Sequence, residues 1–291
     1  MEIYLQLIWN SLVFGLLSAS LAASFSQIYA VSRVLHLVHG AVAVFGGYLY
    51  FSLSSRGAGF VLLLLVAVCG AGILGALVNE LVYEPMRKRR RVAGAAFMIV
   101  SLGGLIFLQN FFLSIWSSKT LRLASPLDQL ETLEIGGVFF TPPAIATVLA
   151  SLLCFAVLGR IMRHTRFGLS VRAVSDHEEM AEIVGIDTRR VRQNVFLLHS
   201  MIAGGFGVLA SMLFALEPSK ATLYAIDAFA VSLLGGLGSL PGALISGVAI
   251  QMTSNVGGFW FPAIFQNAFV FVAIFLFLLV RPQGLFGAKK T

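Results

Sequence analysis

The stretch RIMRHTRFGLSVRAVSDHEEMAEIVGIDTRRVR, residues 160–192, is the longest strongly charged interval in a chain that is otherwise mostly apolar. Such an interval has to lie in water while the apolar segments on both sides lie in lipid. Basic residues crowd both of its ends, which is typical of a loop on the cytoplasmic side of a membrane. The sequence therefore predicts membrane spans that enter and leave a cytoplasmic loop at about 160–192.

The centre of this loop has the pattern of one or two short amphipathic helices, because small and branched apolar residues are scattered among acidic ones. Asp176 is a candidate N-cap with Glu179 three residues later, and Gly185 is placed to end the helix. Two interpretations are open: a solvated connector, or a docking surface for a soluble partner. A compact helical hairpin favours docking, since a plain connector does not need one.

Composition places the chain among integral membrane proteins. Hydrophobic residues make up 58% of it, charged residues 11%, and the mean hydropathy is +0.91. The net charge of +7 is gathered in residues 87–91, 160–192 and 281–290, which indicates loops facing an anionic inner leaflet and excludes a nucleic-acid partner. Cys69 and Cys154 lie in separate apolar runs, so we expect buried thiols and neither a disulfide nor a metal site.

Apolar segments long enough to cross a bilayer lie at about 8–30, 60–83, 93–116, 142–158, 195–216 and 261–280. Two further segments, 32–53 and about 225–256, are interrupted by glycines and are predicted to be short, broken or re-entrant helices. Pro85 is expected to end the span at about 60–83. We therefore expect an all-α polytopic membrane protein with about eight or nine transmembrane segments, in one domain covering residues 1–291. Because no cleavage site precedes the first span, we expect that span to be retained.

Small residues recur every fourth position in two spans, which predicts close helix packing. The two rows are Ser11, Gly15, Ala19 and Ala23, and Ala203, Gly207, Ser211 and Ala215.

Counting crossings from the basic loops puts the N-terminus outside and predicts an inverted repeat. Residues 33–116 would cross the membrane three times, starting inside and ending outside. Residues 225–281 would also cross three times, starting outside and ending inside. The motifs AVAVFGGY (41–48) and AFAVSLLGG (228–236) stand at corresponding places. Glycine-broken segments in such positions indicate a translocation pathway. The alternative is that these glycines serve only helix packing.

Six stretches in the same order make the chain resemble the permease subunits of branched-chain amino acid ABC importers. They are RVLHLVHGAVAVFGGYL (33–49), VYEPMR (82–87) with its basic run, AFMIVSLGGLIFLQN (96–110), RHTRFGLSVRAVSDHEEMAEIVGID (163–187), AFAVSLLGGLGSLPGALISG (228–247) and LLVRPQGLFG (278–287). Together they cover nearly the whole chain. The resemblance implies an ABC importer permease fold in a bacterial inner membrane.

The same resemblance implies partners. They are a second, similar permease, an external substrate-binding protein, membrane lipid, and two cytoplasmic ATPase subunits that would bind ATP and Mg; no cofactor is expected in this chain. In the family a short helix of the central loop docks on an ATPase. The residues expected to couple to it are Arg172, Ala173, Val174, Asp176, Glu178, Glu179, Ala181, Gly185 and Ile186.

The expected translocation pathway is defined by residues of the two glycine-containing segments and one polar residue of the span at 93–116. They are His36, His39, Gly40, Asn110, Asp227, Gly235, Gly236 and Gly238. The family usually has an Asn at His36, an acidic residue at Ala41 and often a Lys at Asp227. Since these differences change the charge along a pathway, the expected cargo is left as branched-chain or other neutral or hydrophobic amino acids, or a related small polar compound.

Two other classes of protein compete with this interpretation. An ion-coupled secondary transporter can also carry inverted repeats, but it should hold its coupling ion with intramembrane carboxylates, and Asp227 is the single candidate. A membrane enzyme would need clustered ligands or nucleophiles, and neither a carboxylate nor a cysteine accompanies His36 and His39. The chain contains no GxxxxGK[ST] sequence. We therefore expect a transport subunit that is not an enzyme and whose ATP is hydrolysed by its partners.

Overall fold

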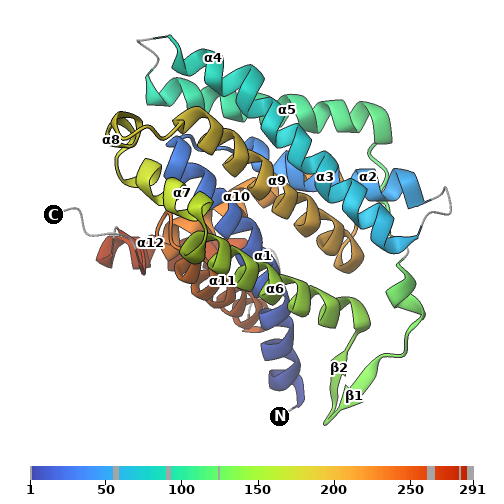
Figure 1. The fold of residues 1–291 in the computed structure, drawn as a ribbon. Helices are drawn as coiled ribbons and strands as arrows, with labels where there is room; N and C mark the ends of the chain where they lie inside the picture. Colours follow the sequence, from blue (N-terminus) through green and yellow to red (C-terminus); the bar gives the residue numbers. More distant parts are fainter. Residues whose placement is uncertain are drawn as a thin grey trace.

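A computed structural model describes residues 2–54, 59–89, 93–123, 125–260, 266–281 and 283–286, and the described chain is dominated by helices (Figure 1). Within these described ranges, five helices are long and apolar enough to cross a membrane, and a bent pair, α10 and α11, raises this to six if it counts as one span. The prediction of an all-α polytopic membrane protein is confirmed. The described elements are α1 (Glu2–Ser32), α2 (Val38–Ser54), α3 (Phe60–Val78), η1 (Asn79–Tyr83), α4 (Glu84–Arg87), α5 (Gly94–Trp116), η2 (Pro126–Gln129), β1 (Leu133–Ile135), β2 (Val138–Phe140), α6 (Pro142–His164), α7 (Arg166–Asp176), α8 (Glu178–Ile183), α9 (Thr188–Leu213), α10 (Lys220–Gly235), α11 (Leu240–Trp260) and α12 (Gln266–Val280).

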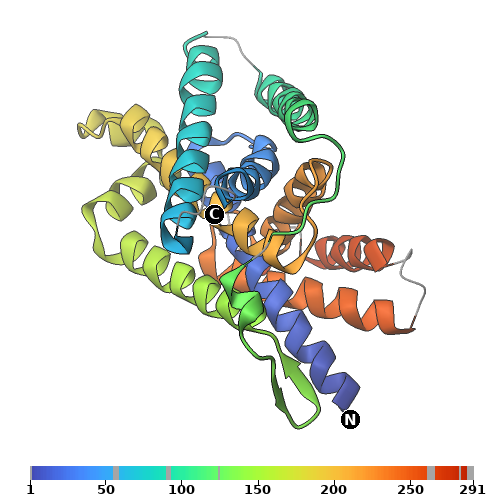
Figure 2. The same ribbon diagram turned by 90° about the vertical axis from the view of Figure 1, so that its right-hand side faces the viewer.

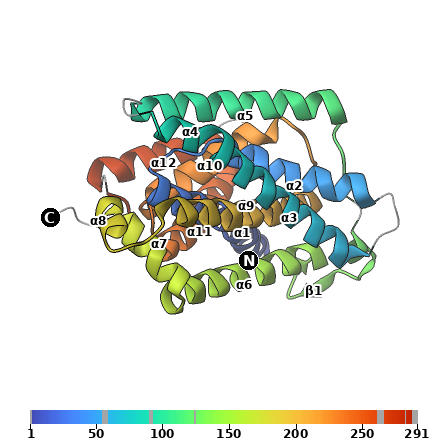
Figure 3. The ribbon, with the colours of Figure 1, turned by 45° about the horizontal axis from the view of Figure 1, so that its top comes forward.

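Helix α1 lies at the centre of the bundle and contacts α9, α10 and α11 (Figures 1 and 3). Small residues make this possible: a Cβ added at Gly15 would lie 2.6 Å from the Cα of Val248 in α11. In the same way, a Cβ at Gly207 in α9 would lie 1.7 Å from the carbonyl oxygen of Ala43 in α2. The close packing predicted from the two rows of small residues is confirmed at these positions.

The helices pack in two matching sets. Helix α1 packs along α11 as α9 packs along α3, α1 meets α10 as α9 meets α2, and α2 meets α10 between them. The start of α9 lies beside the end of α1, where the rings of His36 and Phe196 are 5.0 Å apart, so the two sets run in opposite directions. This is the arrangement of an inverted repeat, and it includes α1 and α9, which lie outside the ranges predicted from the sequence.

The two ends of the bundle differ in composition. The outer end carries a β-hairpin, β1 paired antiparallel with β2, which lies beside the start of α1 (Figure 2). The backbone N–H of Phe139 donates to Oε1 of Gln6 over 2.7 Å and fixes the hairpin there. No strand is predicted between the spans at 93–116 and 142–158, so this hairpin is a feature that sequence reasoning missed. The opposite end, called the inner end below, carries the basic loops.

The span at about 60–83 does not end at Pro85. Helix α3 continues through the π-helical turn η1 into α4, and the backbone N–H of Glu84 donates to the carbonyl oxygen of Asn79, five residues earlier. Proline lacks a backbone N–H and crowds the preceding turn. The wider π-helical turn accommodates it, so the helix runs on to Arg87.

One predicted helix break is correct and the other is displaced. Between α10 and α11 the chain bends by 116°, and Gly236 and Gly238 have φ of 92° and 93°, which favours glycine. In the other glycine-containing segment, 32–53, the helix is interrupted at 33–37, whereas Gly40, Gly46 and Gly47 lie inside the continuous helix α2. A Cβ at Gly40 would lie 2.1 Å from the carbonyl oxygen of Ala221, so this glycine serves the contact between α2 and α10.

Several predicted boundaries also change. Helix α6 extends to His164 and α9 begins at Thr188, which leaves residues 165–187 as the cytoplasmic segment proper. Cys69 is exposed on α3 rather than buried, and Cys154 is half-buried; both are free thiols. Residues 90–92, 261–265, 282 and 287–291 lie outside the described residues, and with them fall parts of the first basic run, of the last span and of the C-terminal motif.

Candidate functional site

The cytoplasmic segment (165–187) folds as two short helices joined at a sharp turn. The hydroxyl of Thr165 accepts from the backbone N–H of Gly168 at 3.0 Å and caps the start of α7. Val171 and Val174 are buried and belong to a core cluster with Ile28 of α1 and Met162 of α6. One face of α7 is therefore fixed to the inner ends of two spans.

The turn between the helices differs from the prediction. Asp176 is the last residue of α7, and His177 is the N-cap of α8, without a side-chain capping bond. The predicted capping box of Asp176 and Glu179 is therefore wrong. The prediction for Gly185 is confirmed: it has φ of 90°, its N–H donates to the carbonyl oxygen of Glu182, and the N–H of Ile186 donates to that of Ala181. These two bonds form a Schellman motif that ends α8.

The tip of the cytoplasmic segment presents exposed apolar side chains. Met180, Ile183 and Val184 are 62%, 77% and 75% exposed, and they lie next to exposed acidic residues such as Glu179. We call these three residues the apolar tip. Apolar side chains grouped on a surface outside the membrane mark an interaction site.

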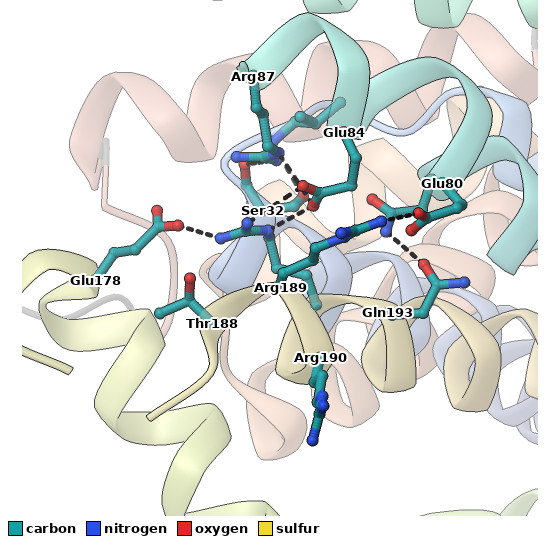
Figure 4. A network of polar contacts seen from close by, with 12 residues as sticks. Ser32, Glu80, Glu84, Arg87, Glu178, Thr188, Arg189, Arg190 and Gln193 are labelled. Carbon is teal, nitrogen blue, oxygen red and sulfur yellow. Dashed lines mark hydrogen bonds and ion pairs between the residues drawn. The ribbon is translucent and has the colours of Figure 1, made fainter. Parts of the chain in front are cut away.

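A buried arginine joins this segment to the spans. Nε of Arg192, in the first turns of α9, donates to Oε1 of Glu84 over 2.8 Å, and its Nη1 donates to the carboxylate of Glu178. Arg192 and Glu84 are only 6% and 4% exposed. Figure 4 shows Glu84 and Glu178, the two carboxylates that pair with Arg192. The start of α8 is thus tied to α4, which continues α3, through a residue of α9.

Further polar contacts tie the same elements to the end of α1. Arg87 donates to the carbonyl oxygen of Ser32, and Nη2 of Arg33 donates to the carbonyl oxygen of Ser175 at the end of α7, over 2.7 Å (Figure 4 for Arg87 and Ser32). Arg189 pairs with Glu80 on η1. The inner ends of α1, α3 and α9 are therefore all tied to the cytoplasmic segment, because each is bonded to it or to the Arg192 network.

A cleft of about 780 Å³ opens between α4 and the cytoplasmic segment. Met86 and Lys88 line one wall, and Glu182 and Arg189 line the other. The paired groups Glu84, Arg192 and Glu178 also line it. The ion pairs of Arg192 with Glu84 and Glu178 therefore lie at the boundary between α4 and the cytoplasmic segment.

The structure brings most of the predicted coupling residues together at this site. Val174 and Ala181 are buried and hold α7 and α8 on the bundle, with Ala173 and Ile186 partly buried beside them. Arg172 is exposed and donates to the carbonyl oxygen of Met162. Glu178 and Glu179 differ, because Glu179 is exposed whereas Glu178 is engaged by Arg192.

Three of the predicted pathway residues, His36, His39 and Asp227, lie in a largely buried polar seam beside α1. Nε2 of His39 lies 2.7 Å from the hydroxyl of Ser24, and Nδ1 of His36 lies 2.9 Å from the hydroxyl of Tyr83. Further along α1, Ser18 donates to Asp227 of α10. Both histidines are fully buried. These side chains are paired with others inside the bundle.

The remaining pathway residues separate into two places. The turn at Gly235, Gly236 and Gly238 contacts the inner part of α1, where the N–H of Gly238 donates to the hydroxyl of Ser26. Asn110 is exposed on α5 and donates to the carbonyl oxygen of Ile106 on its own helix. Asn110 therefore lies apart from the polar seam.

Sequence reasoning missed Arg192 and Glu84 as members of the candidate site. A signal was present, because Val191 and Val195 flank Arg192 at a helical spacing that turns it toward the core. The apolar tip was also missed, since Ile183 and Val184 in an amphipathic helix are normally assigned to its buried face.

Comparison with known proteins gives matches along the whole chain. The family model described as "Branched-chain amino acid transport system / permease component" matches residues 7–280. The chain is 25% identical to the high-affinity branched-chain amino acid transport system permease protein LivH of Salmonella typhimurium, over 99% of this chain and 97% of that protein. It is also 25% identical to the guanosine ABC transporter permease protein NupQ of Bacillus subtilis, over 77% of this chain and 72% of that protein.

One solved structure has a similar fold. It is described as PsaBC from Streptococcus pneumoniae in complex with Fab, and it matches with a TM-score of 0.50 at 12% identity. The match covers 93% of this chain and 89% of that chain. The similarity thus extends well beyond the cytoplasmic segment and includes the helices that carry it.

Proposed function

Since the chain belongs to the family of branched-chain amino acid transport system permease components, we propose that it is the permease subunit of an ATP-driven importer in the inner membrane. It forms one half of the translocation pathway beside a second, similar permease. Two ATPase subunits bind ATP and Mg on the cytoplasmic side, and an external binding protein delivers the cargo. The chain itself is a transport subunit and not an enzyme.

The observation that supports this proposal best is the apolar tip on a helix bonded to the spans. Ile183 and Val184 are about three-quarters exposed, so they offer a partner an apolar contact at the inner end. Glu178, at the start of the same helix, is held by Arg192, which also holds Glu84. A partner that moves α8 therefore moves α3 and α9 with it, which is how ATPase closure would reach the membrane.

The cargo is proposed from the relatives. LivH is named for branched-chain amino acids and matches nearly the full chain, whereas NupQ is named for guanosine and matches about three-quarters of it. Branched-chain or other neutral amino acids are therefore the first candidates, and a nucleoside is the second.

The described carboxylates support ATP-driven transport over ion coupling. Asp227 accepts from Ser18 within the bundle, while Glu80 and Glu84 at the inner end are paired with arginines. A secondary transporter would need carboxylates free to bind a coupling ion.

Uptake into proteoliposomes tests the proposal. The chain, reconstituted with its proposed partner permease, ATPases and binding protein, should accumulate labelled leucine or guanosine only when ATP is enclosed with the ATPases. Uptake that follows an imposed proton or sodium gradient without ATP would contradict it.

A further inference from the structure

A second cavity lies at the inner end, between α6 and the start of α11, apart from the Arg192 network. Its volume is about 590 Å³. Helices α6 and α11 each pack along α1, and Gln27 of α1 lines the cavity between them. The amide nitrogen of Gln27 donates to the carbonyl oxygen of Gly238 over 2.9 Å, which fixes the turn between α10 and α11 as one wall.

The cavity is strongly basic. Arg160, Arg163, His164 and Arg172 line it, and its lining contains no aspartate or glutamate. None of these three arginines takes part in an ion pair between described residues, whereas Arg189, Arg190 and Arg192 of the neighbouring helix are each paired. The positive charge in the cavity is therefore left without a protein counter-charge.

A helix terminus adds to this charge. The 21-residue helix α11 begins at the cavity wall with Leu240 and Pro241, and the hydroxyl of Ser239 caps it by accepting from the N–H of Gly242 at 3.1 Å. The N-terminal end of a helix carries partial positive charge. Arginines and helix terminus thus favour the same ligand, an anion such as a phosphate group.

The other half of the cavity is apolar. Phe155, Leu240 and Leu244 line it, and a Cβ added at Gly159 would meet nothing within 4 Å. On α6 the basic groups lie at the cytoplasmic end, and Phe155 lies one to two turns deeper in the span, facing the same cavity as Leu240 and Leu244 of α11. A ligand that fits both halves is anionic at the water boundary and hydrocarbon toward the bilayer, which a free phosphate is not.

We propose that this cavity binds an anionic phospholipid of the inner leaflet. Arg160 and Arg163 contact its phosphate group, and an acyl chain lies over Gly159 against Phe155 and Leu244. The bound lipid would fill the space between α6, which leads into the cytoplasmic segment, and the turn between α10 and α11.

The full chain in nanodiscs, titrated with phosphatidylglycerol or phosphatidylcholine and analysed by native mass spectrometry, tests this proposal. We expect tight binding of phosphatidylglycerol and a dissociation constant roughly tenfold or more higher in Arg160→Gln/Arg163→Gln, because each basic contact contributes to headgroup binding. The control Arg166→Gln/Arg190→Gln removes two exposed charges outside the cavity and should bind as the wild type does. Equal weakening in both double variants would show general electrostatic attraction and overturn the proposal.

A variant that changes no charge tests the proposed position of the acyl chain. Gly159→Leu should weaken phosphatidylglycerol binding, whereas Gly103→Leu, at another glycine with open space on α5, should not. Elution on size-exclusion chromatography checks that each variant is folded. Binding unchanged by Gly159→Leu would contradict the proposal. So would an absence of preference for phosphatidylglycerol together with arginine-dependent binding of inorganic phosphate, since the ligand would then be free phosphate.

Discussion

Nε of Arg192 lies 2.8 Å from Oε1 of Glu84, and both charged side chains are almost completely buried where α9 meets α4. Removing one partner of a buried pair costs about 3–5 kcal/mol, and Glu84 would keep only the longer 3.8 Å contact with Nε of Arg87. We expect Arg192→Met to lower the free energy of unfolding of the purified chain by about this amount, and its melting temperature with it. The matched control is Arg190→Met, because the Arg190–Asp187 pair is exposed and contributes about 1 kcal/mol or less. Equal melting temperatures for the two variants would contradict the buried pair.

The two neighbouring glutamates should respond differently to charge reversal. Glu178 accepts from Arg192, so Glu178→Lys places two cations together and loses a charged hydrogen bond of about 1.5–3 kcal/mol. Glu179 is exposed, so Glu179→Lys should leave the melting temperature unchanged. Thermal unfolding of the two single variants measures this. The same loss for both would show that Arg192 does not hold Glu178.

Glycine substitutions distinguish packing from space. A Cβ at Gly40 or at Gly15 would overlap the backbone of a neighbouring helix, with closest distances of 2.1 Å and 2.6 Å. Gly40→Leu and Gly15→Leu should therefore both reduce the yield of folded chain severely, by the mechanism of overpacking. Gly103→Leu, where nothing lies within 4 Å, is the control. A normal yield of folded Gly40→Leu with blocked uptake would instead support the pathway role expected from the sequence.

Thiol labelling checks the orientation. Glu131, just before β1, and His177, between α7 and α8, are both exposed. Figure 1 shows the hairpin and these two helices at opposite ends of the bundle. With Cys69 and Cys154 replaced, Glu131→Cys should react with an impermeant reagent in intact cells and His177→Cys only in inverted vesicles. Ser125 is a poor site, because it is 5% exposed and caps η2. Reaction of both cysteines from one side would overturn the orientation.

Much of the fold could be predicted because apolar length and basic loops report directly on the bilayer. The span at 93–116 differs from α5 by one residue at its start, and the glycine turn at 236–238 is where it was predicted. What could not be predicted depends on tertiary packing. Gly40 looks like a helix breaker in sequence, yet a glycine in a membrane helix also allows close contact, and only the position of Ala221 decides between the two.

The candidate site divides in the same way. The cytoplasmic segment and the end of helix α8 at Gly185 follow from local charge and turn chemistry. The bond between Arg192 and Glu84 joins residues 108 positions apart, so no local pattern contains it. Asp176 is a good N-cap by composition, but α7 is extended through it because Val171 and Val174 pack on α1 and α6.

The most direct test of the coupling role is to measure cargo uptake and cargo-dependent ATP hydrolysis, each as a rate, in the reconstituted importer when the apolar tip is changed. Ile183→Asp/Val184→Asp should reduce cargo-dependent uptake and ATP hydrolysis by roughly tenfold or more, as loss of a central apolar contact does, while the chain keeps its melting temperature because both side chains are exposed. Leu133→Asp, at a 55% exposed position of the outer hairpin, should have no effect. Wild-type uptake and hydrolysis in the double variant would contradict the account.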